Sequence, residues 1–132
     1  MTVFVDTSAL YAAADQEDAE HRRSVAAWSD LLLRSVTLLT TNYVLLETSA
    51  LLQSRLGHSA LRAFHQDVYP LLSVDWISLE RHRAGVEAVL TAARRKLSIV
   101  DCVSFHTMRS QSVQTAFAFD PHFREQGFHL IP

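Results

Sequence analysis

Residues 115–120, Thr-Ala-Phe-Ala-Phe-Asp, decide the fold class of this chain. The four consecutive apolar residues from Ala116 to Phe119 leave no polar face, which predicts a short strand covered by helices on both sides. Strands of this kind belong to parallel sheets in which helices connect successive strands. Asp120 then stands at the carboxyl end of the strand, the edge where open parallel sheets bind ligands.

The rest of the chain supports this fold class, because short β-branched or aromatic runs alternate with stretches of helical periodicity. The predicted strands are 2–5, 36–40, 72–77, 115–119 and 128–131. The predicted helices are 8–14, 20–35, 42–56, 59–68, 79–95 and 98–110. The helix over 79–95 is expected to bury Val86, Val89, Leu90 and Ala93. We therefore expect one α/β domain over residues 1–132, with three layers (α/β/α) around a mainly parallel sheet of about five strands.

Composition places the chain among ordinary globular proteins. Hydrophobic residues make up 48% and charged residues 20%, which is not the balance of a disordered chain. The single cysteine, Cys102, cannot form an intramolecular disulfide. The start of the sequence lacks a basic leader, and no apolar run reaches the roughly 20 residues of a membrane span. We expect a soluble, cytoplasmic protein without membrane association.

The charge balance is informative about partners. A formal net charge of −2 argues, on its own, against nucleic-acid binding. Two divalent cations bound to acidic residues would change the local balance by about +4 and remove this objection. Lys96 is the only lysine, and the guanidinium groups of the remaining basic residues suit phosphate oxygens.

Four acidic residues are expected at one edge of the sheet. Asp6 and Asp120 directly follow the first and fourth predicted strands. Glu47 lies in the first two turns of the helix after the second strand. Asp101 lies in the first turn of the helix that leads into the fourth strand, and that helix should begin at the same edge.

Glu47 carries the clearest signal among these acids. Val44, Glu47 and Leu51 share one helix face, so a carboxylate continues an apolar stripe. A buried acid is costly unless it is paired, hydrogen-bonded or bound to metal. Two carboxylates about 4 Å apart repel by about 4 kcal/mol at an effective dielectric constant near 20. Oxygen ligands at an open edge favour Mg²⁺ or Mn²⁺, and the hydroxyls of Thr7 and Ser8 lie beside Asp6.

Ordinary structural roles compete with this interpretation. Asp6 and Asp120 could be turn residues, and Ser98 with Asp101 forms a capping-box pattern. The histidines lack the spacing of a metal site, and only His122, two residues after Asp120, is a candidate. The basic run 94–96 (Arg94, Arg95 and Lys96) is typical of a solvated helix end, and its alternative role at the mouth of an acidic site is to hold a nucleic-acid backbone.

Four blocks of sequence resemble PIN domains, especially those of VapC-type toxins. They are residues 3–10 (Val-Phe-Val-Asp-Thr-Ser-Ala-Leu), 41–48 (Thr-Asn-Tyr-Val-Leu-Leu-Glu-Thr), 97–105 (Leu-Ser-Ile-Val-Asp-Cys-Val-Ser-Phe) and 116–123 (Ala-Phe-Ala-Phe-Asp-Pro-His-Phe). The resemblance covers nearly the whole chain, in order and at fitting intervals. A single Asp-Thr-Ser is weak evidence, whereas the four blocks together are specific.

The resemblance implies a PIN-like α/β/α domain with endoribonuclease activity that depends on Mg²⁺ or Mn²⁺. It makes Asp6, Glu47, Asp101 and Asp120 the catalytic metal ligands. It also implies a homodimer that is silenced by a cognate antitoxin protein, and a structured RNA substrate such as tRNA or rRNA. The residues expected to contact substrate are Thr7, Ser8, Ser104, Arg94, Arg95 and Lys96. The family sometimes has an acid at the position of His122, which leaves a second metal site in doubt.

Other classes fit less well. A phosphoacceptor receiver domain needs a lysine after a late strand, whereas Lys96 lies between two predicted helices. A dehalogenase-type phosphatase needs an acid at position 8, which is Ser8. The glycine-rich loop of a dinucleotide-binding fold is absent.

Two alternatives remain open: a PIN ribonuclease of RNA processing or decay without an antitoxin, and a non-catalytic PIN module that binds RNA or protein. A small antitoxin gene beside this one would discriminate the toxin from the first alternative.

Overall fold

The computed structural model describes residues 1–132 and contains one five-stranded sheet in which every neighbouring pair of strands is parallel. The strand order is β3-β2-β1-β4-β5. The strands are β1 (Thr2–Val5), β2 (Thr37–Thr41), β3 (Ser73–Asp75), β4 (Thr115–Phe117) and β5 (His129–Ile131). The predicted α/β class and the parallel sheet are confirmed.

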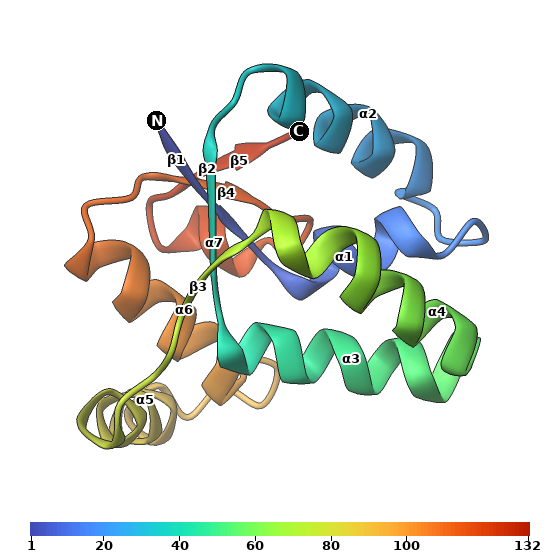
Figure 1. Cartoon of the computed structure of the whole chain (residues 1–132). Helices are drawn as coiled ribbons and strands as arrows, with labels where there is room; N and C mark the ends of the chain where they lie inside the picture. The colour runs from blue at the N-terminus through green and yellow to red at the C-terminus, as the bar shows by residue number, and fades with distance from the viewer.

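Helices cover both faces of this sheet. They are α1 (Thr7–Ala14), α2 (His21–Leu33), α3 (Asn42–Leu56), α4 (His58–Ala63), α5 (Leu79–Ala92), α6 (Ile99–Ser110) and α7 (His122–Glu125). The chain moves from β1 outward to β3 and then returns to β4 on the other side of β1. Right-handed crossovers therefore place the earlier and the later helices on opposite faces. Figure 1 shows α1, α2 and α4 on one side of the sheet and α5 and α6 on the other.

Local sequence explains where α3 begins and ends. The Thr41 hydroxyl accepts a hydrogen bond from the Val44 backbone N–H at 3.2 Å, which caps the first turn. Gly57 ends the helix with a φ of 92°, a left-handed conformation that a side chain disfavours. The expected helix over residues 42–56 is therefore confirmed, and its start lies directly at the carboxyl end of β2.

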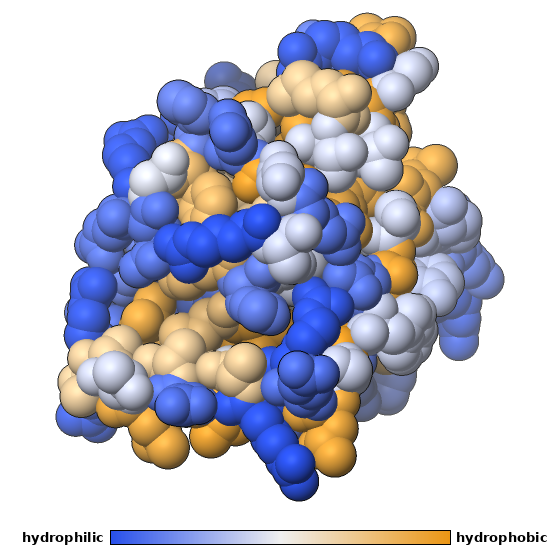
Figure 2. Space-filling model, turned by 90° about the vertical axis from the view of Figure 1, so that its left-hand side faces the viewer, coloured by the Kyte–Doolittle hydropathy of each residue, from blue (hydrophilic) through white to orange (hydrophobic).

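The expectation for α5 was wrong in two respects. The helix ends at Ala92 rather than at residue 95, because Ala93 adopts a left-handed conformation with a φ of 50°. Leu90, which is 72% exposed, and Ala93, which is also exposed, are not buried as expected. The cause is Gly85, whose position packs directly against Val103 of α6, so the face through Gly85 and Val89 is the buried one. Figure 2 shows apolar side chains along the lower edge of the face over α5 and α6.

Other boundaries also differ from the expectations. The predicted helix 59–68 divides into α4 and a π-helical turn over Phe64–Val68, followed by a 3-10 turn over Tyr69–Leu71. The predicted strands 72–77 and 115–119 are shorter, and β4 ends because the Phe119 backbone N–H donates to the Ser8 hydroxyl instead of the sheet. None of the helices combines the length and the apolar character needed to cross a bilayer.

The sequence did not predict α7, which has only four residues. Phe123 anchors this helix because its side chain is fully buried. Its ring lies 5.0 Å from that of Phe105 and 6.2 Å from that of Phe4, measured between ring centroids. This packing fixes the segment that follows Asp120 against the sheet, next to the candidate site.

Candidate active site

The candidate site lies where the strand order reverses. The chain leaves β1 toward β2 on one side, whereas β4 lies on the other side of β1. The carboxyl ends of β1 and β4 therefore border the crevice at which open α/β sheets bind ligands. Asp6 directly follows β1, and Asp120 follows β4 after two residues.

Asp6 is 4% exposed and caps α1. Its Oδ2 accepts hydrogen bonds from the Ser8 backbone N–H at 3.1 Å and from the Ser8 hydroxyl at 2.7 Å. Burial is the largest influence and raises the pKa of Asp6 to about 7, against the lowering effect of Ser8. The charges of Asp101 and Glu47 raise this pKa further.

Glu47 approaches the same crevice from α3. Its side chain is half-buried, one turn after the fully buried Val44. Burial raises the pKa of Glu47, and the charges of Asp101 and Asp120 add to the increase. The Thr7 hydroxyl partly offsets it through a hydrogen bond. The expectation that this carboxylate continues an apolar stripe is confirmed.

Asp101 has two roles in the structure. Its Oδ2 accepts a hydrogen bond from the Ser98 backbone N–H at 3.0 Å, and its own N–H donates to the Ser98 hydroxyl at 3.0 Å. This is the capping box that begins α6. The residue is only 8% exposed, and burial raises the pKa of Asp101, with a further contribution from Asp120. The cap therefore holds a carboxylate at the crevice.

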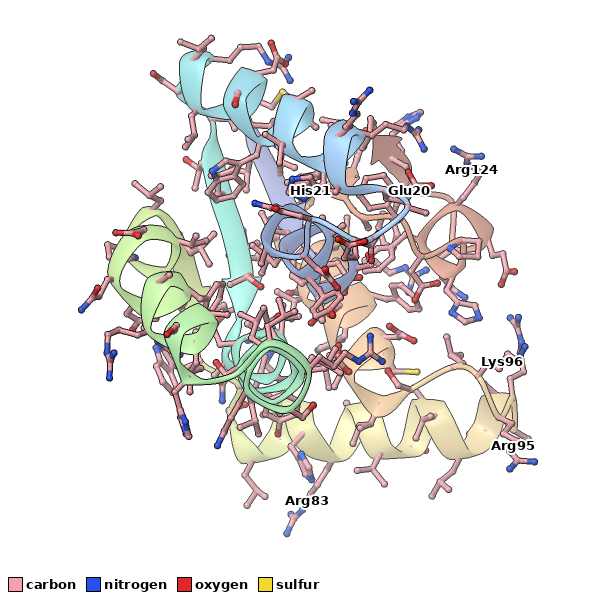
Figure 3. All side chains as sticks on the ribbon, turned by 90° about the vertical axis from the view of Figure 1, so that its right-hand side faces the viewer. Glu20, His21, Arg83, Arg95, Lys96 and Arg124 are labelled. Carbon is pink, nitrogen blue, oxygen red and sulfur yellow. The ribbon has the colours of Figure 1, made fainter.

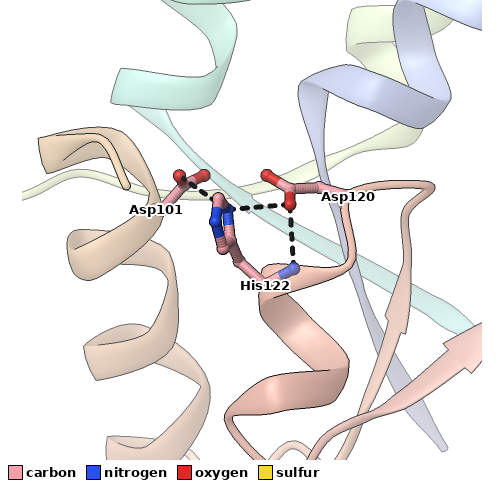
Figure 4. Close-up of side chains that lie close together, drawn as sticks. All are labelled: Asp101, Asp120 and His122. Carbon is pink, nitrogen blue, oxygen red and sulfur yellow. Dashed lines mark hydrogen bonds and ion pairs between the residues drawn. The ribbon is translucent and has the colours of Figure 1, made fainter. Parts of the chain in front are cut away.

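Asp120 forms the open side of the cluster together with His122. Asp120 Oδ1 accepts a hydrogen bond from the His122 backbone N–H at 2.9 Å. His122 Nδ1 lies 2.9 Å from the same oxygen and 3.7 Å from Asp101 Oδ2. Figure 4 shows the imidazole between the two carboxylates. One ligand atom from each of these three side chains lies within 4.8 Å of the others.

The structure brings all four expected acids to one edge of the sheet. Asp101 repels the other three acids, and Glu47 repels Asp6 and Asp120. Sequence alone did not establish that His122 lies among them. Its only signal was its place two residues after Asp120, because α7 is too short for a periodic pattern.

The hydroxyls expected near substrate have partners within the protein. The Ser8 hydroxyl links Asp6 to the Phe119 backbone N–H, which ties the ends of β1 and β4 together. The Thr7 hydroxyl lies 3.0 Å from that of Thr48, and both side chains are buried. Ser104 is completely buried and donates to the Val100 carbonyl at 2.9 Å. These contacts support the fold around the acids, so a substrate contact by any of the three hydroxyls stays a prediction.

The basic run 94–96 lies in the turn between α5 and α6. Arg94 forms an ion pair with Glu125 of α7 at 2.9 Å, which ties this turn to the helix that carries His122. Arg95 and Lys96 are exposed. Figure 3 shows Arg95, Lys96 and Arg124 along one side of the molecule.

A comparison with protein families agrees with this geometry. The model of the PIN domain matches residues 3–129. The chain belongs to the PIN-domain family. This PIN domain is 32% identical to the 23S rRNA-specific endonuclease VapC20 of Mycobacterium tuberculosis, strains CDC 1551 / Oshkosh and ATCC 25618 / H37Rv. Each alignment spans 127 residues, 96% of this chain and 95% of the relative.

Solved structures give the same result for the fold. The crystal structure of Mycobacterium tuberculosis VapC20, described as a sarcin-ricin loop cleaving toxin, superposes with a TM-score of 0.82 at 32% identity. That match covers 98% of this chain and 99% of the other. FitAcB from Neisseria gonorrhoeae superposes with a TM-score of 0.68 at 16% identity, over 100% of this chain and 97% of the other. At this low identity the second match supports the PIN fold alone.

Proposed function

We propose that this PIN domain is a divalent-metal-dependent endoribonuclease, the toxin of a toxin–antitoxin pair, and that it cuts ribosomal RNA in the sarcin-ricin loop. The observation that carries this proposal is the convergence of Asp6, Glu47, Asp101 and Asp120 at the reversal point of the sheet. The substrate is inferred from VapC20, whose described activity is on 23S rRNA and whose likeness extends over nearly the whole chain.

The residues fit a divalent cation. Three of the four carboxyls have raised pKa values, mainly because they are buried and in addition because they repel one another. A protein can relieve such repulsion with protons or with a cation, and oxygen-rich sites select Mg²⁺ or Mn²⁺. We assign the four carboxylates as the groups that hold the ion. The chemistry that such an ion supplies is Lewis acidity toward water and phosphate oxygens.

The chain's own residues position this site. Ser8 holds Asp6 and the exit of β4 at a fixed separation through two hydrogen bonds. Ser98 fixes Asp101 through the capping box, and the backbone of His122 fixes Asp120. Burial of Asp6 and Asp101 excludes water from one side of the crevice, which strengthens electrostatic interactions there. Asp120, whose side chain is 23% exposed, is the carboxylate that we expect to face an entering phosphodiester.

The RNA backbone would be held by the basic residues along one side of the crevice. A groove of about 310 Å³ is lined by Phe119 and Pro121, the chain neighbours of Asp120, and by Arg23, Arg124 and Glu20. Arg95 and Lys96 extend the positive charge along the same side (Figure 3). Each cation that contacts a phosphate releases condensed counterions, so RNA affinity should fall with salt. This local basic margin offsets the net charge of −2.

We assign two apolar surfaces to protein partners. The first is a cavity of about 280 Å³ between α1, α2, α4 and the π-helical turn. Nine of its ten lining residues are hydrophobic, which suits an apolar segment of an antitoxin. Leu46, Trp76 and Leu79 are 65–71% exposed, and a groove of about 540 Å³ runs beside Leu46 and Trp76. This second surface is assigned to the homodimer. Trp76→Glu should convert a dimer into a monomer in size-exclusion chromatography with light scattering.

The test of the function uses purified protein and a hairpin RNA with the sarcin-ricin loop sequence. Reactions contain Mg²⁺, Mn²⁺ or excess EDTA, and an unrelated tRNA is the competing substrate. We expect cleavage of the hairpin at one position with either ion and none with EDTA. Cleavage that persists in EDTA would contradict the metal-dependent mechanism. Cleavage of the tRNA in preference to the hairpin would contradict the substrate assignment.

A further inference from the structure

His122 occupies an unusual position for a histidine. Its side chain is only 12% exposed, and the buried anchor Phe123 holds the start of α7 in place. The ring nitrogen Nδ1 is inaccessible to solvent and lies between carboxylates from two separate elements. Burying a polar nitrogen costs free energy unless it finds a partner.

Nδ1 has no hydrogen-bond partner despite these close contacts. It lies 2.9 Å from Asp120 Oδ1, but the arrangement does not have the direction that a ring N–H needs to donate. Asp120 Oδ1 instead accepts from the His122 backbone N–H. The cluster therefore contains a nitrogen whose hydrogen-bonding capacity is unused.

The spacing of the three side chains suits shared coordination of one ion. Neighbouring ligands of an octahedral Mg²⁺ lie about 2.9 Å apart, and opposite ones about 4.1 Å. The ligand atoms of Asp101, Asp120 and His122 all lie within 4.8 Å of one another, with Nδ1 at 2.9 Å and 3.7 Å from the two oxygens. The distance of 2.9 Å equals the spacing of neighbouring ligands, and the distance of 3.7 Å lies between the two octahedral spacings.

We infer that His122 is a nitrogen ligand of the metal ion held by Asp101 and Asp120, and that it sets a preference for Mn²⁺ over Mg²⁺. This inference rests on the proposed function and refines its metal site. Mn²⁺, a transition-metal ion, accepts an imidazole nitrogen beside carboxylate oxygens more readily than Mg²⁺ does, because Mg²⁺ is bound almost entirely through oxygen. Replacing His122 should therefore weaken Mn²⁺ binding more than Mg²⁺ binding.

The alternative role of His122 is structural, as a group that only packs beside Asp120. A direct measurement distinguishes the two roles. Mn²⁺ is added to the purified protein, and pulsed electron paramagnetic resonance records the hyperfine coupling of nitrogen to the ion. We expect a ¹⁴N coupling in the wild type, its conversion to ¹⁵N after ¹⁵N-histidine labelling, and its loss in His122→Gln. His106→Gln, at an exposed position on α6, is the matched control and should keep the coupling.

Calorimetric titration of the same proteins with Mn²⁺ and Mg²⁺ completes the test. We expect His122→Gln to weaken Mn²⁺ binding by about tenfold or more, and Mg²⁺ binding by clearly less. Bound Mn²⁺ without a nitrogen coupling in the wild type would overturn the ligand role and leave the ribonuclease proposal intact. Failure of the wild type to bind Mn²⁺ at all would overturn the metal site on which both proposals depend.

Discussion

Asp6→Asn should make the metal-free protein more stable at neutral pH while it abolishes RNA cleavage. Burial, the largest cause, raises the pKa of Asp6 from 3.8 to about 7 in the folded state. Between these two values the folded state binds more protons than the unfolded state, so the free energy of unfolding falls as the pH rises. Asparagine does not titrate, and its side-chain oxygen can still accept the hydrogen bonds of Ser8.

The magnitude follows from the shift in pKa. At about 1.4 kcal/mol per pKa unit, the full effect of ionising Asp6 is about 4 kcal/mol. About 2 kcal/mol of this falls between pH 5.5 and 7.5. For a domain of this size that corresponds to a decrease in Tm of about 7 °C. The remaining acids leave a smaller pH dependence in Asp6→Asn.

The assay is thermal unfolding by circular dichroism in EDTA at pH 5.5 and 7.5, for the wild type and Asp6→Asn. We expect the Tm of the wild type to fall by several degrees more than the Tm of the variant when the pH is raised from 5.5 to 7.5. Comparing the change in Tm with pH in the two proteins, rather than the Tm values themselves, cancels any pH-independent cost of the substitution. An equal change in Tm with pH in the two proteins would refute the reasoning that Asp6 is protonated in the metal-free site.

Three further predictions concern the metal, the RNA and the packing. Mg²⁺ at about one hundred times its Kd should raise the free energy of unfolding by about 2.7 kcal/mol, and a Tm that does not respond would contradict a preformed site. The double variant Arg95→Ala/Lys96→Ala should bind RNA more weakly, and the slope of log K against log[salt] should become less steep by about 2. Arg83→Ala on α5 should change neither the affinity nor the slope. Gly85→Ala would place a Cβ 2.5 Å from Val103 Cγ2. The free energy of unfolding measured in urea should therefore fall by about 1–3 kcal/mol. An increase in this free energy would contradict the close packing of α5 on α6.

The acids at strand ends could be predicted because a local pattern, a short apolar strand followed by an acid, places each of them at the carboxyl end of a parallel strand. Asp6 and Asp120 follow parallel strands, and the carboxyl ends of such strands share one edge. Glu47 was identified because a carboxylate interrupts an apolar stripe. Asp101 was predicted both as a cap and as a site residue, and the structure shows that the cap fixes the carboxylate at the crevice. In each case a local pattern determined the position.

The parts that could not be predicted depend on contacts between distant elements. Leu90 is apolar yet exposed, because the absence of a side chain at Gly85 decides which face of α5 packs on α6. The place of His122 depends on Phe123, which packs on rings from β1 and α6. A four-residue helix shows no periodicity, so α7 gives no signal in the sequence.

The central claim is that four carboxylates form one metal-dependent site for RNA cleavage. The most direct test is the single-turnover rate of hairpin cleavage in Mg²⁺ for Asp6→Asn, Glu47→Gln, Asp101→Asn and Asp120→Asn, each confirmed as folded. Asp30→Asn is the matched control, because Asp30 is an exposed carboxylate on α2 that pairs only with Arg34. We predict a loss of at least about a hundredfold in each of the four variants, in the range seen when one group that stabilises a transition state is removed, and an unchanged rate in the control. A rate within a few-fold of the wild type in any of the four would contradict the claim that these acids act as one site.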